Sequence, residues 1–454
     1  MIRRLGYAVP VLVVAILGFL PVLRSWWLHD DWYFLADALG LGARPGSLVR
    51  PVSYQLYWSL LVPLFGLAPW PWALTRLALH AASALMVARL ARRAGLDAAG
   101  AAAAGAIFAA APVAFESLCW GTGAVELLGA FLALAALDRW LAGDGRSRGL
   151  ALVLAGLAVG AKESGLFLAP VFAWTLHRES RLRSWAGAGT VVLAAVGVGA
   201  ALLVRRDVAA TAAYALDLRH ALRNGLVFGA WLLTPGPLLR DATLTSRLGA
   251  VLGSLAWLLW VTAVQTVRPD RRRAAAAALV LGVLALVPAL VTGDHAVPRY
   301  LYASFAAVAV TVALMLYPQR GPSRGSLTLL TVLLVTSALG TTLYHRDARH
   351  PSGRPLHRLV FKEEVSRLAC RAVVGANLGP GDRVVFLRDP ATDDAQWALM
   401  QDVLGGDRAV RVLTRGNATA AWRDHADPSD RGAFVFVVRG AMLAPAGRAG
   451  APAP

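Results

Sequence analysis

The chain has 454 residues, 57% of them hydrophobic, and its mean hydropathy is +0.55. Soluble globular proteins carry about 45–50% apolar residues, so this composition excludes a soluble class and predicts an integral membrane protein. The net charge of +18 comes mainly from arginines in short runs between apolar stretches, where cytoplasmic loops usually carry them. Nucleic acid is therefore not an expected partner.

Apolar runs of about 17–25 residues can span a bilayer, and the arginine-rich loops between them indicate the cytoplasmic side. Alternating the sides predicts a mostly α fold, a polytopic bundle of about eleven spans with a cytoplasmic N-terminus. The expected spans are 5–24, 70–89, 98–115, 124–141, 150–161, 164–177, 186–204, 248–267, 274–292, 300–317 and 326–344. A long outer loop covers 25–69, and the remaining apolar segment 219–238 is expected to lie on the outer interface.

A single helix over 150–177 would place Lys162 and Glu163 in mid-membrane and move the arginines at 178–183 outside. Two short helices joined by a turn at Lys162 avoid both problems. Each arm of about thirteen residues is roughly 20 Å long, against a hydrocarbon core of roughly 30 Å. The turn is therefore expected to lie below the outer surface and to line a cavity.

The composition changes after Tyr344: charged residues become more frequent, apolar runs shorten, and Pro and Gly residues separate the runs. The expected strands are 383–387, 409–413 and 433–438, and the expected helices are 357–376 and 392–404. The predicted organisation is a membrane domain over 1–345, a small extracytoplasmic α/β domain over 346–443 and a disordered tail over 444–454.

Two adjacent carboxylates, Asp30 and Asp31, directly follow the first span, among tryptophans. They fit solvated charges beside an interfacial aromatic belt. They also fit a general base at the rim of a membrane cavity, because partial desolvation and a like charge raise proton affinity toward the working pH. The pair alone leaves both interpretations open.

Lys162 and Glu163 form a stronger signal, because ionisable side chains at membrane depth cost roughly 2.5–3.5 kcal/mol each at a helix centre. A self-compensating pair at a helix turn is the alternative. Arg299 and Tyr300 belong to a third cluster at an outer helix mouth, where interfacial anchoring is the alternative. That cluster also contains Asp294 and His295.

Further arginines are expected on the outer side, against the usual distribution of positive charge. They are Arg50, Arg205, Arg206, Arg219 and Arg223. An anionic ligand explains them, and a phosphate suits Arg and Lys best. Other residues fit packing roles: His80 as a hydrogen-bonded core residue, and Cys119 and Cys370 as buried thiols without a disulfide.

Taken in chain order, these motifs resemble the C-type (GT-C) membrane glycosyltransferases, in particular the protein O-mannosyltransferases and the transmembrane-and-TPR O-mannosyltransferases. The resemblance covers about residues 1–345. It rests on His29-Asp30-Asp31-Trp32, Arg50-Pro51-Val52-Ser53, Phe115-Glu116-Ser117-Leu118-Cys119-Trp120 leading to Glu126, Ala161-Lys162-Glu163-Ser164-Gly165, and Arg299-Tyr300-Leu301-Tyr302. The chain departs from the family at Ala111-Pro112, where His-Pro is frequent, and it shows no 34-residue TPR period.

The resemblance implies an enzyme of the cell (plasma) membrane that uses a polyprenyl-phosphate-linked sugar and inverts the anomeric centre on the outer face. The acceptor is a protein, a glycan or a lipid. It further implies that Asp30 is the catalytic base and that Asp31 orients the acceptor or the sugar. Lys162, Arg299 and Arg50 would hold the donor phosphate, with Glu163 orienting Lys162. The supporting residues are Glu163, Glu116, Glu126 and Tyr300. No cofactor is implied, and the residues neither require nor exclude a divalent metal.

Two other classes are compatible with the sequence. A secondary transporter or lipid flippase would also carry intramembrane charges, although it commonly shows related halves with matching interrupted helices. A non-catalytic scaffold presenting the α/β module gives no reason for Lys162 and Glu163. Since every candidate chemical residue precedes Tyr344, the C-terminal module is expected to serve acceptor choice or stability.

Overall fold

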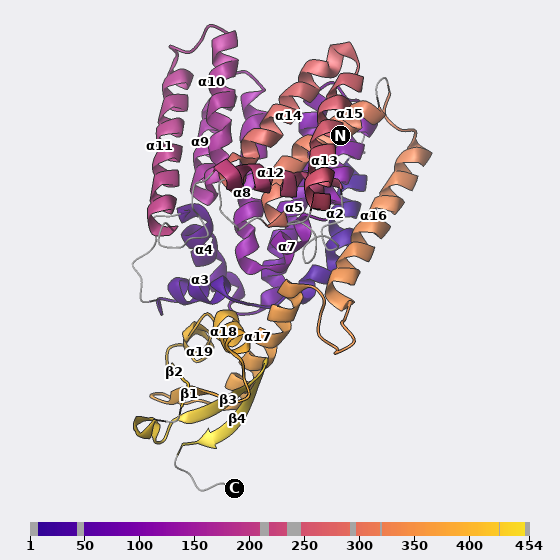
Figure 1. Cartoon of the computed structure of the whole chain (residues 1–454). Coiled ribbons are helices and arrows are strands. Elements are labelled where there is room, and N and C mark those ends of the chain that lie inside the picture. Colours follow the sequence, from indigo (N-terminus) through magenta and orange to yellow (C-terminus); the bar gives the residue numbers. More distant parts are fainter. Residues whose placement is uncertain are drawn as a thin grey trace.

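The computed structural model describes residues 8–42, 50–208, 218–233, 247–290, 297–317, 320–425 and 427–449. A bundle of helices is joined at one end to a small α/β unit (Figure 1). The longer bundle helices are α2 (Ala8–Phe19), α5 (Pro69–Arg93), α6 (Ala98–Ala109), α8 (Ala124–Trp140), α9 (Gly145–Ala161), α10 (Leu168–Arg178), α11 (Trp185–Val208), α12 (Leu218–Leu233), α13 (Arg247–Thr266), α14 (Pro269–Leu290), α15 (Tyr302–Leu316) and α16 (Arg324–Asp347). The shorter elements between them are η1 (Leu20–Arg24), α3 (Asp30–Ala38), η2 (Pro51–Leu56), α4 (Tyr57–Phe65), α7 (Ala114–Cys119), η3 (Gly121–Gly123), η4 (Glu163–Phe167) and η6 (Pro298–Leu301).

Five segments in the described part of the chain are long and apolar enough to cross a membrane, so the chain is a membrane protein. They are Pro69–Arg93, Gly121–Trp140, Pro269–Leu290, Pro298–Leu316 and Arg324–Asp347. Shorter apolar helical stretches cover Ala8–Arg24, Ala98–Ala109, Trp185–Gly199 within α11 and Val251–Thr266 within α13. The prediction of about eleven spans is therefore wrong for the described residues.

Breaks in the backbone explain part of the shorter count. Pro21 falls where the first helix tightens into η1, and α6 ends at Ala109, three residues before Pro112. Proline lacks the amide hydrogen and clashes with the preceding turn, so a helix rarely continues through it. The predicted hairpin is present as α9 and α10, separated at Lys162, where the backbone is extended with φ −157° and ψ 136°. These breaks turn apolar runs into shorter helices.

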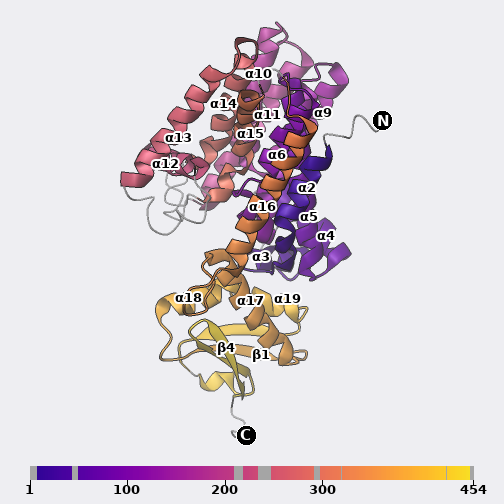
Figure 2. The ribbon, with the colours of Figure 1, turned by 90° about the vertical axis from the view of Figure 1, so that its right-hand side faces the viewer.

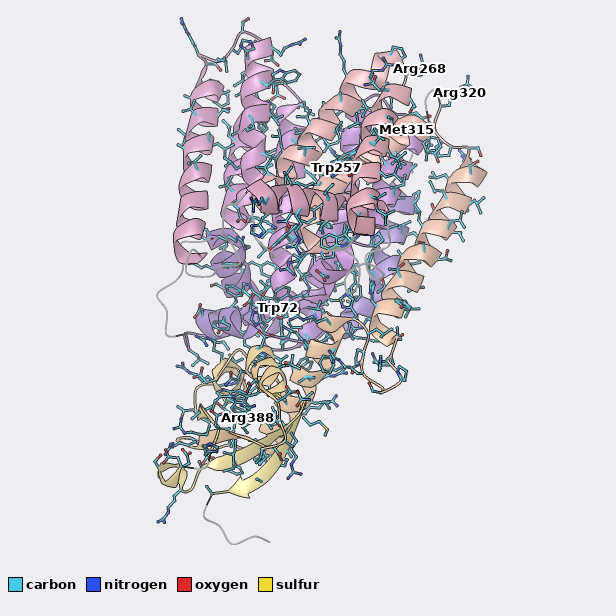
Figure 3. The ribbon with its side chains drawn as sticks, in the orientation of Figure 1. Trp72, Trp257, Arg268, Met315, Arg320 and Arg388 are labelled. Atoms are coloured by element: carbon cyan, nitrogen blue, oxygen red, sulfur yellow. The ribbon has the colours of Figure 1, made fainter. Side chains whose placement is uncertain are left out.

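The two ends of the bundle differ in what they carry. In Figure 3, Arg268 and Arg320 lie at the end of the bundle far from the α/β unit, which contains Arg388. The α10–α11 turn, which contains the arginines at 178–183, lies at the same far end (Figure 1). The arginine-rich loops and the C-terminal unit thus occupy opposite ends. Segment 219–238 forms α12 over its described part, and its place on the outer interface stays a prediction.

The C-terminal unit packs helices against a four-stranded sheet. Its elements are α17 (Arg358–Gly375), β1 (Arg383–Arg388), α18 (Asp394–Val403), α19 (Arg408–Leu413), β2 (Thr419–Arg423), β3 (Phe434–Arg439) and β4 (Met442–Arg448). The sheet order is β2-β1-β3-β4, with β1 parallel to β2 and β3, and β4 antiparallel to β3. Two expectations are wrong here. The run 409–413 is helix α19, because a short apolar run does not distinguish helix from strand. Residues 444–448, expected in the disordered tail, pair with β3 as the end of β4.

The first loop region joins the C-terminal unit in one hydrophobic core. α3 lies between the bundle and helices α17 and α18 (Figure 2). The buried side chains of this core include Trp27, Trp32, Leu35, Trp58, Trp72, Val365, Ala369, Met400 and Val403. Trp32 Nε1 donates a hydrogen bond of 3.1 Å to the Val403 carbonyl, and Ser366 Oγ donates one of 2.7 Å to the Trp27 carbonyl. Apolar burial and these buried hydrogen bonds hold the unit against the bundle.

Candidate functional site

A cavity of about 420 Å³ lies at the junction between the bundle and the C-terminal unit. Its lining combines charged and aromatic side chains from seven elements or their flanking residues. The residues are Leu28, His29, Asp30, Arg50, Tyr54, Glu116, Trp120, Thr122, Val125, Glu126, Val297, Arg299, Tyr300, Arg358, Leu359 and Lys362. Six of the nine sequence-predicted site residues are among them: Asp30, Arg50, Glu116, Glu126, Arg299 and Tyr300.

The two adjacent aspartates have different environments. Both lie in the first turn of α3, where successive side chains point about 100° apart around the helix axis. Asp30 lines the cavity, its side chain is 38% exposed, and its Oδ1 lies 2.9 Å from His29 Nε2. Asp31 is fully buried, and its carboxylate accepts hydrogen bonds from Thr122 N and Oγ1, both 2.7 Å, and from Leu28 N, 3.2 Å. Burial raises the pKa of Asp31 to about 6, against these hydrogen bonds. Only Asp30 is open to the cavity.

Lys162 and Glu163 do not pair with each other by hydrogen bond. Lys162 Nζ donates to Glu126, and Glu163 accepts two hydrogen bonds from Arg50, of 2.8 and 2.7 Å. The extended backbone at Lys162 explains this, because successive side chains of an extended segment point to opposite sides. Glu163 thus binds Arg50 directly, and its role in orienting Lys162 stays a prediction. Neither side chain is among the lining residues of the cavity.

The Arg50-Pro51-Val52-Ser53 motif attaches the first loop region to the hairpin turn. Besides the Arg50–Glu163 pair, Ser53 Oγ donates a hydrogen bond of 2.6 Å to the Ala161 carbonyl at the end of α9. A Cβ at Gly160 would lie 2.8 Å from Val52 Cγ2, so glycine permits this close approach. Arg50 itself has φ 51°, a left-handed conformation that costs energy for a residue with a side chain. Together these contacts fix Arg50 at the wall of the cavity.

Arg299 is held more loosely than the other predicted phosphate-binding cations. Its Nη1 lies 3.8 Å from Glu116 Oε2, and its guanidinium stacks 4.6 Å from the centroid of the Trp120 ring. Lys162 also faces an aromatic ring, with Nζ 4.5 Å from the centroid of Tyr300. Each of the three predicted phosphate-binding cations pairs with a carboxylate, and the Arg299–Glu116 contact is the longest of these three pairs. An anion that binds at Arg299 would therefore disrupt a weaker existing ion pair than one that binds at Arg50 or Lys162.

Besides Tyr54 and Thr122, several polar residues of the cavity region were not predicted as site residues. His29 lies between Asp30 and Asp402, while Arg358, Lys362 and Asp402 come from the C-terminal unit. His29 is adjacent to the acidic pair in sequence, which was the available signal. Nothing in the sequence spacing links Lys362 or Asp402 to residues more than 330 positions earlier. The expectation that chemically relevant residues all precede Tyr344 therefore does not describe this cavity.

Other predicted residues are accounted for elsewhere. His80 is buried and within 2.9 Å of both the Tyr302 hydroxyl and the Ala109 carbonyl, as predicted for a core histidine. Cys119 and Cys370 are buried free thiols. Asp294 and His295 lie outside the described residues, as do the side chains of Arg205 and Arg206. Within the described ranges, no group of three or more His, Cys, Asp or Glu residues is arranged to hold a metal ion.

No protein-family model and no curated protein matches the chain. Solved structures with a similar backbone include the archaeal oligosaccharyltransferase AglB from Archaeoglobus fulgidus in complex with an inhibitory peptide and a dolichol-phosphate, at 15% identity and TM-score 0.48, over 91% of this chain and 64% of that one. The apo form of the Archaeoglobus fulgidus oligosaccharyltransferase matches at 12% identity and TM-score 0.45, over 95% and 66%. The same enzyme tethered to an acceptor peptide matches at 14% identity and TM-score 0.46, over 94% of this chain and 64% of that one. The chain thus spans slightly less than two thirds of the length of these proteins.

Proposed function

We propose that this chain is a membrane glycosyltransferase that transfers a sugar from a polyprenyl-phosphate-linked donor to an acceptor, with inversion. One observation carries the proposal: an accessible carboxylate, Asp30, and two arginines, Arg50 and Arg299, line the same cavity at the end of an apolar helical bundle. Such a donor has a hydrocarbon tail for the membrane and a phosphate for the arginines. The sequence motifs make a hexose such as mannose the first sugar to test.

Asp30 is the proposed general base. It accepts the proton of the acceptor hydroxyl while the acceptor oxygen forms a bond to the anomeric carbon. The bond from that carbon to the phosphate oxygen breaks, and polyprenyl phosphate leaves from the opposite face, which inverts the centre. Asp31 is less suited to this step, because its oxygens already accept three hydrogen bonds and it is fully buried. We assign to Asp31 the task of holding the loop to Thr122.

Arg299 is the proposed main contact of the donor phosphate. Negative charge grows on the leaving phosphate in the transition state, and a guanidinium placed beside it stabilises that charge. Arg50 and Lys162 support the site through their pairs with Glu163 and Glu126, which fix the hairpin turn beside the cavity. Glu116 and Tyr300 position Arg299, the first by its 3.8 Å contact and the second by its ring.

The proposed setting is the plasma membrane, crossed several times, with the N-terminus in the cytoplasm and the α/β domain, residues 346–443, outside. The opposite placement of the arginine-rich loops and the C-terminal unit supports this orientation, since such loops usually stay in the cytoplasm (Figure 3). The chemistry then takes place on the outer face, where a protein, glycan or lipid acceptor meets the cavity.

A transfer assay tests the proposal. Purified protein in nanodiscs is supplied with a panel of polyprenyl-phosphate sugars labelled in the sugar, and covalent transfer and donor hydrolysis are both measured. We expect wild-type protein to release polyprenyl phosphate from at least one donor. Movement of intact donor across a liposome membrane without cleavage would instead support a flippase. Absence of cleavage with every donor would overturn the proposal.

A further inference from the structure

The C-terminal unit contacts the first turn of α3 directly. The backbone amide of His29 donates a hydrogen bond of 3.3 Å to the carbonyl of Val403, the last residue of α18. Gly405 follows with φ +57°, and a Cβ there would lie 3.1 Å from both the His29 carbonyl oxygen and Trp32 Cβ. α18 therefore ends against the residue that precedes Asp30, and Asp402 is brought beside His29.

His29 lies between two carboxylates from different parts of the chain. Its Nε2 is 2.9 Å from Asp30 Oδ1, and its Nδ1 is 2.5 Å from Asp402 Oδ1. The second oxygen of Asp402 pairs with Lys362 Nζ of α17. His29 has φ 48° and ψ −116°, a conformation that costs energy for a non-glycine residue and persists only where surrounding contacts fix it. The Asp402 contact and the Val403 hydrogen bond are two such contacts.

The pKa shifts of His29 and Asp402 both favour the charged form of the side chain. Burial works against a charged imidazole, but the hydrogen bonds to Asp30 and Asp402 raise the pKa of His29 to about 10. Burial likewise opposes ionisation of Asp402, yet its hydrogen bonds to His29 and Lys362 lower its pKa to about 2. Both nitrogens of the His29 ring thus lie within ion-pair distance of a carboxylate oxygen, 2.9 Å for Asp30 and 2.5 Å for Asp402.

We propose that Asp402 is a positioning residue for the sugar-transfer reaction: it holds His29, and His29 holds the Asp30 carboxylate with one oxygen engaged and the other open to the acceptor. This inference rests on the proposed function. It assigns the C-terminal unit a part in the active site itself, because the group that orients the base comes from α18. Lys362 in turn fixes the second oxygen of Asp402.

The test compares Asp402→Asn with Asp394→Asn, a matched change on the same helix. The Asp394 side chain is 94% exposed and pairs with Arg388, away from His29. Asp402→Asn should lower kcat roughly 10–100-fold, the usual effect of removing a partner that orients an active-site residue, with donor KM within about twofold of wild type. Asp394→Asn should keep the wild-type kcat. Asp402→Glu, which restores the charge, should recover part of the loss.

A double-mutant cycle separates positioning from a general structural effect. If Asp402 acts through His29, then Asp402→Asn should add little to the loss already caused by His29→Asn. Losses that multiply, an Asp402→Asn enzyme with wild-type kcat, or an Asp402→Asn protein that fails to fold would each overturn the inference. Thermal unfolding and donor binding on the same preparations identify the last case. A wild-type protein that cleaves no donor would instead overturn the proposed function, so the two failures are distinguishable.

Discussion

Gly405 offers a direct test of how closely the C-terminal unit must approach α3. Gly405→Ala places a Cβ 3.1 Å from the His29 carbonyl oxygen and from Trp32 Cβ, closer than the 3.4–4 Å of ordinary contact. Its neighbour Gly406 is the matched control, because it also has positive φ, +68°, but a Cβ there meets only the end of the Arg408 side chain at 3.7 Å. The two variants share the backbone cost and differ in the contact.

The expected magnitudes follow from these distances. Forcing a side chain into a left-handed conformation costs about 1–2 kcal/mol, so both variants should be less stable by that amount. Gly405→Ala must also shift α3 and α18 apart by a few tenths of an ångström. Since a 1 Å misplacement costs about 100-fold in rate, this shift should lower kcat roughly 3–10-fold, and only in Gly405→Ala. Thermal unfolding and transfer kinetics in nanodiscs measure both effects. Equal kcat for the two variants would refute the reasoning.

Three other predictions follow from the site and the topology. Arg299→Met removes a charge-assisted contact to phosphate worth about 1.5–3 kcal/mol, so donor affinity should weaken about 10–100-fold in a fluorescence titration; unchanged affinity would remove Arg299 from the donor site. The folded pKa of His29, about 10, exceeds its usual 6.5, so its contribution to stability is fully present below pH 6.5 and is lost as pH rises toward 10. The difference in thermal midpoint between wild type and His29→Asn should therefore narrow over that range, and a difference that widens would contradict the charged pair. Single cysteines introduced at Arg271 and Gly440 should be labelled from opposite sides of the membrane, and labelling of both from one side would refute the proposed orientation.

The helices of the bundle were predictable because apolar runs bounded by arginines leave few other arrangements. The number of spans was not predicted correctly, in part because Pro21 and Pro112 shorten helices within runs that are apolar throughout. In the C-terminal unit, Arg383–Arg388 reads as a strand from its consecutive Val, Phe and Leu residues. Thr419–Arg423 does not, because its two alanines carry no strand preference and its place comes from pairing with β1.

The candidate site likewise contains residues that the sequence predicted and partners that it did not. The sequence singled out Asp30, Arg50 and Arg299, which line one cavity, because charged side chains beside apolar spans are costly and are therefore candidates for a function. Their partners could not be identified: Arg50 binds Glu163, and the group beside His29 is Asp402 of the C-terminal unit. Such pairs depend on the close packing of segments that are distant in the chain, and local sequence patterns do not predict that packing.

The measurement that tests the central claim most directly is sugar transfer by Asp30→Asn beside wild type and Asp31→Asn. The asparagine keeps the size and polarity of Asp30 but cannot accept the proton. Transfer should therefore fall by about 10²–10⁴-fold in Asp30→Asn, the usual contribution of general-base catalysis, while donor affinity stays within about twofold. Transfer by Asp30→Asn within about threefold of the wild-type rate, with the same donor and acceptor, would show that Asp30 is not the base and contradict the account.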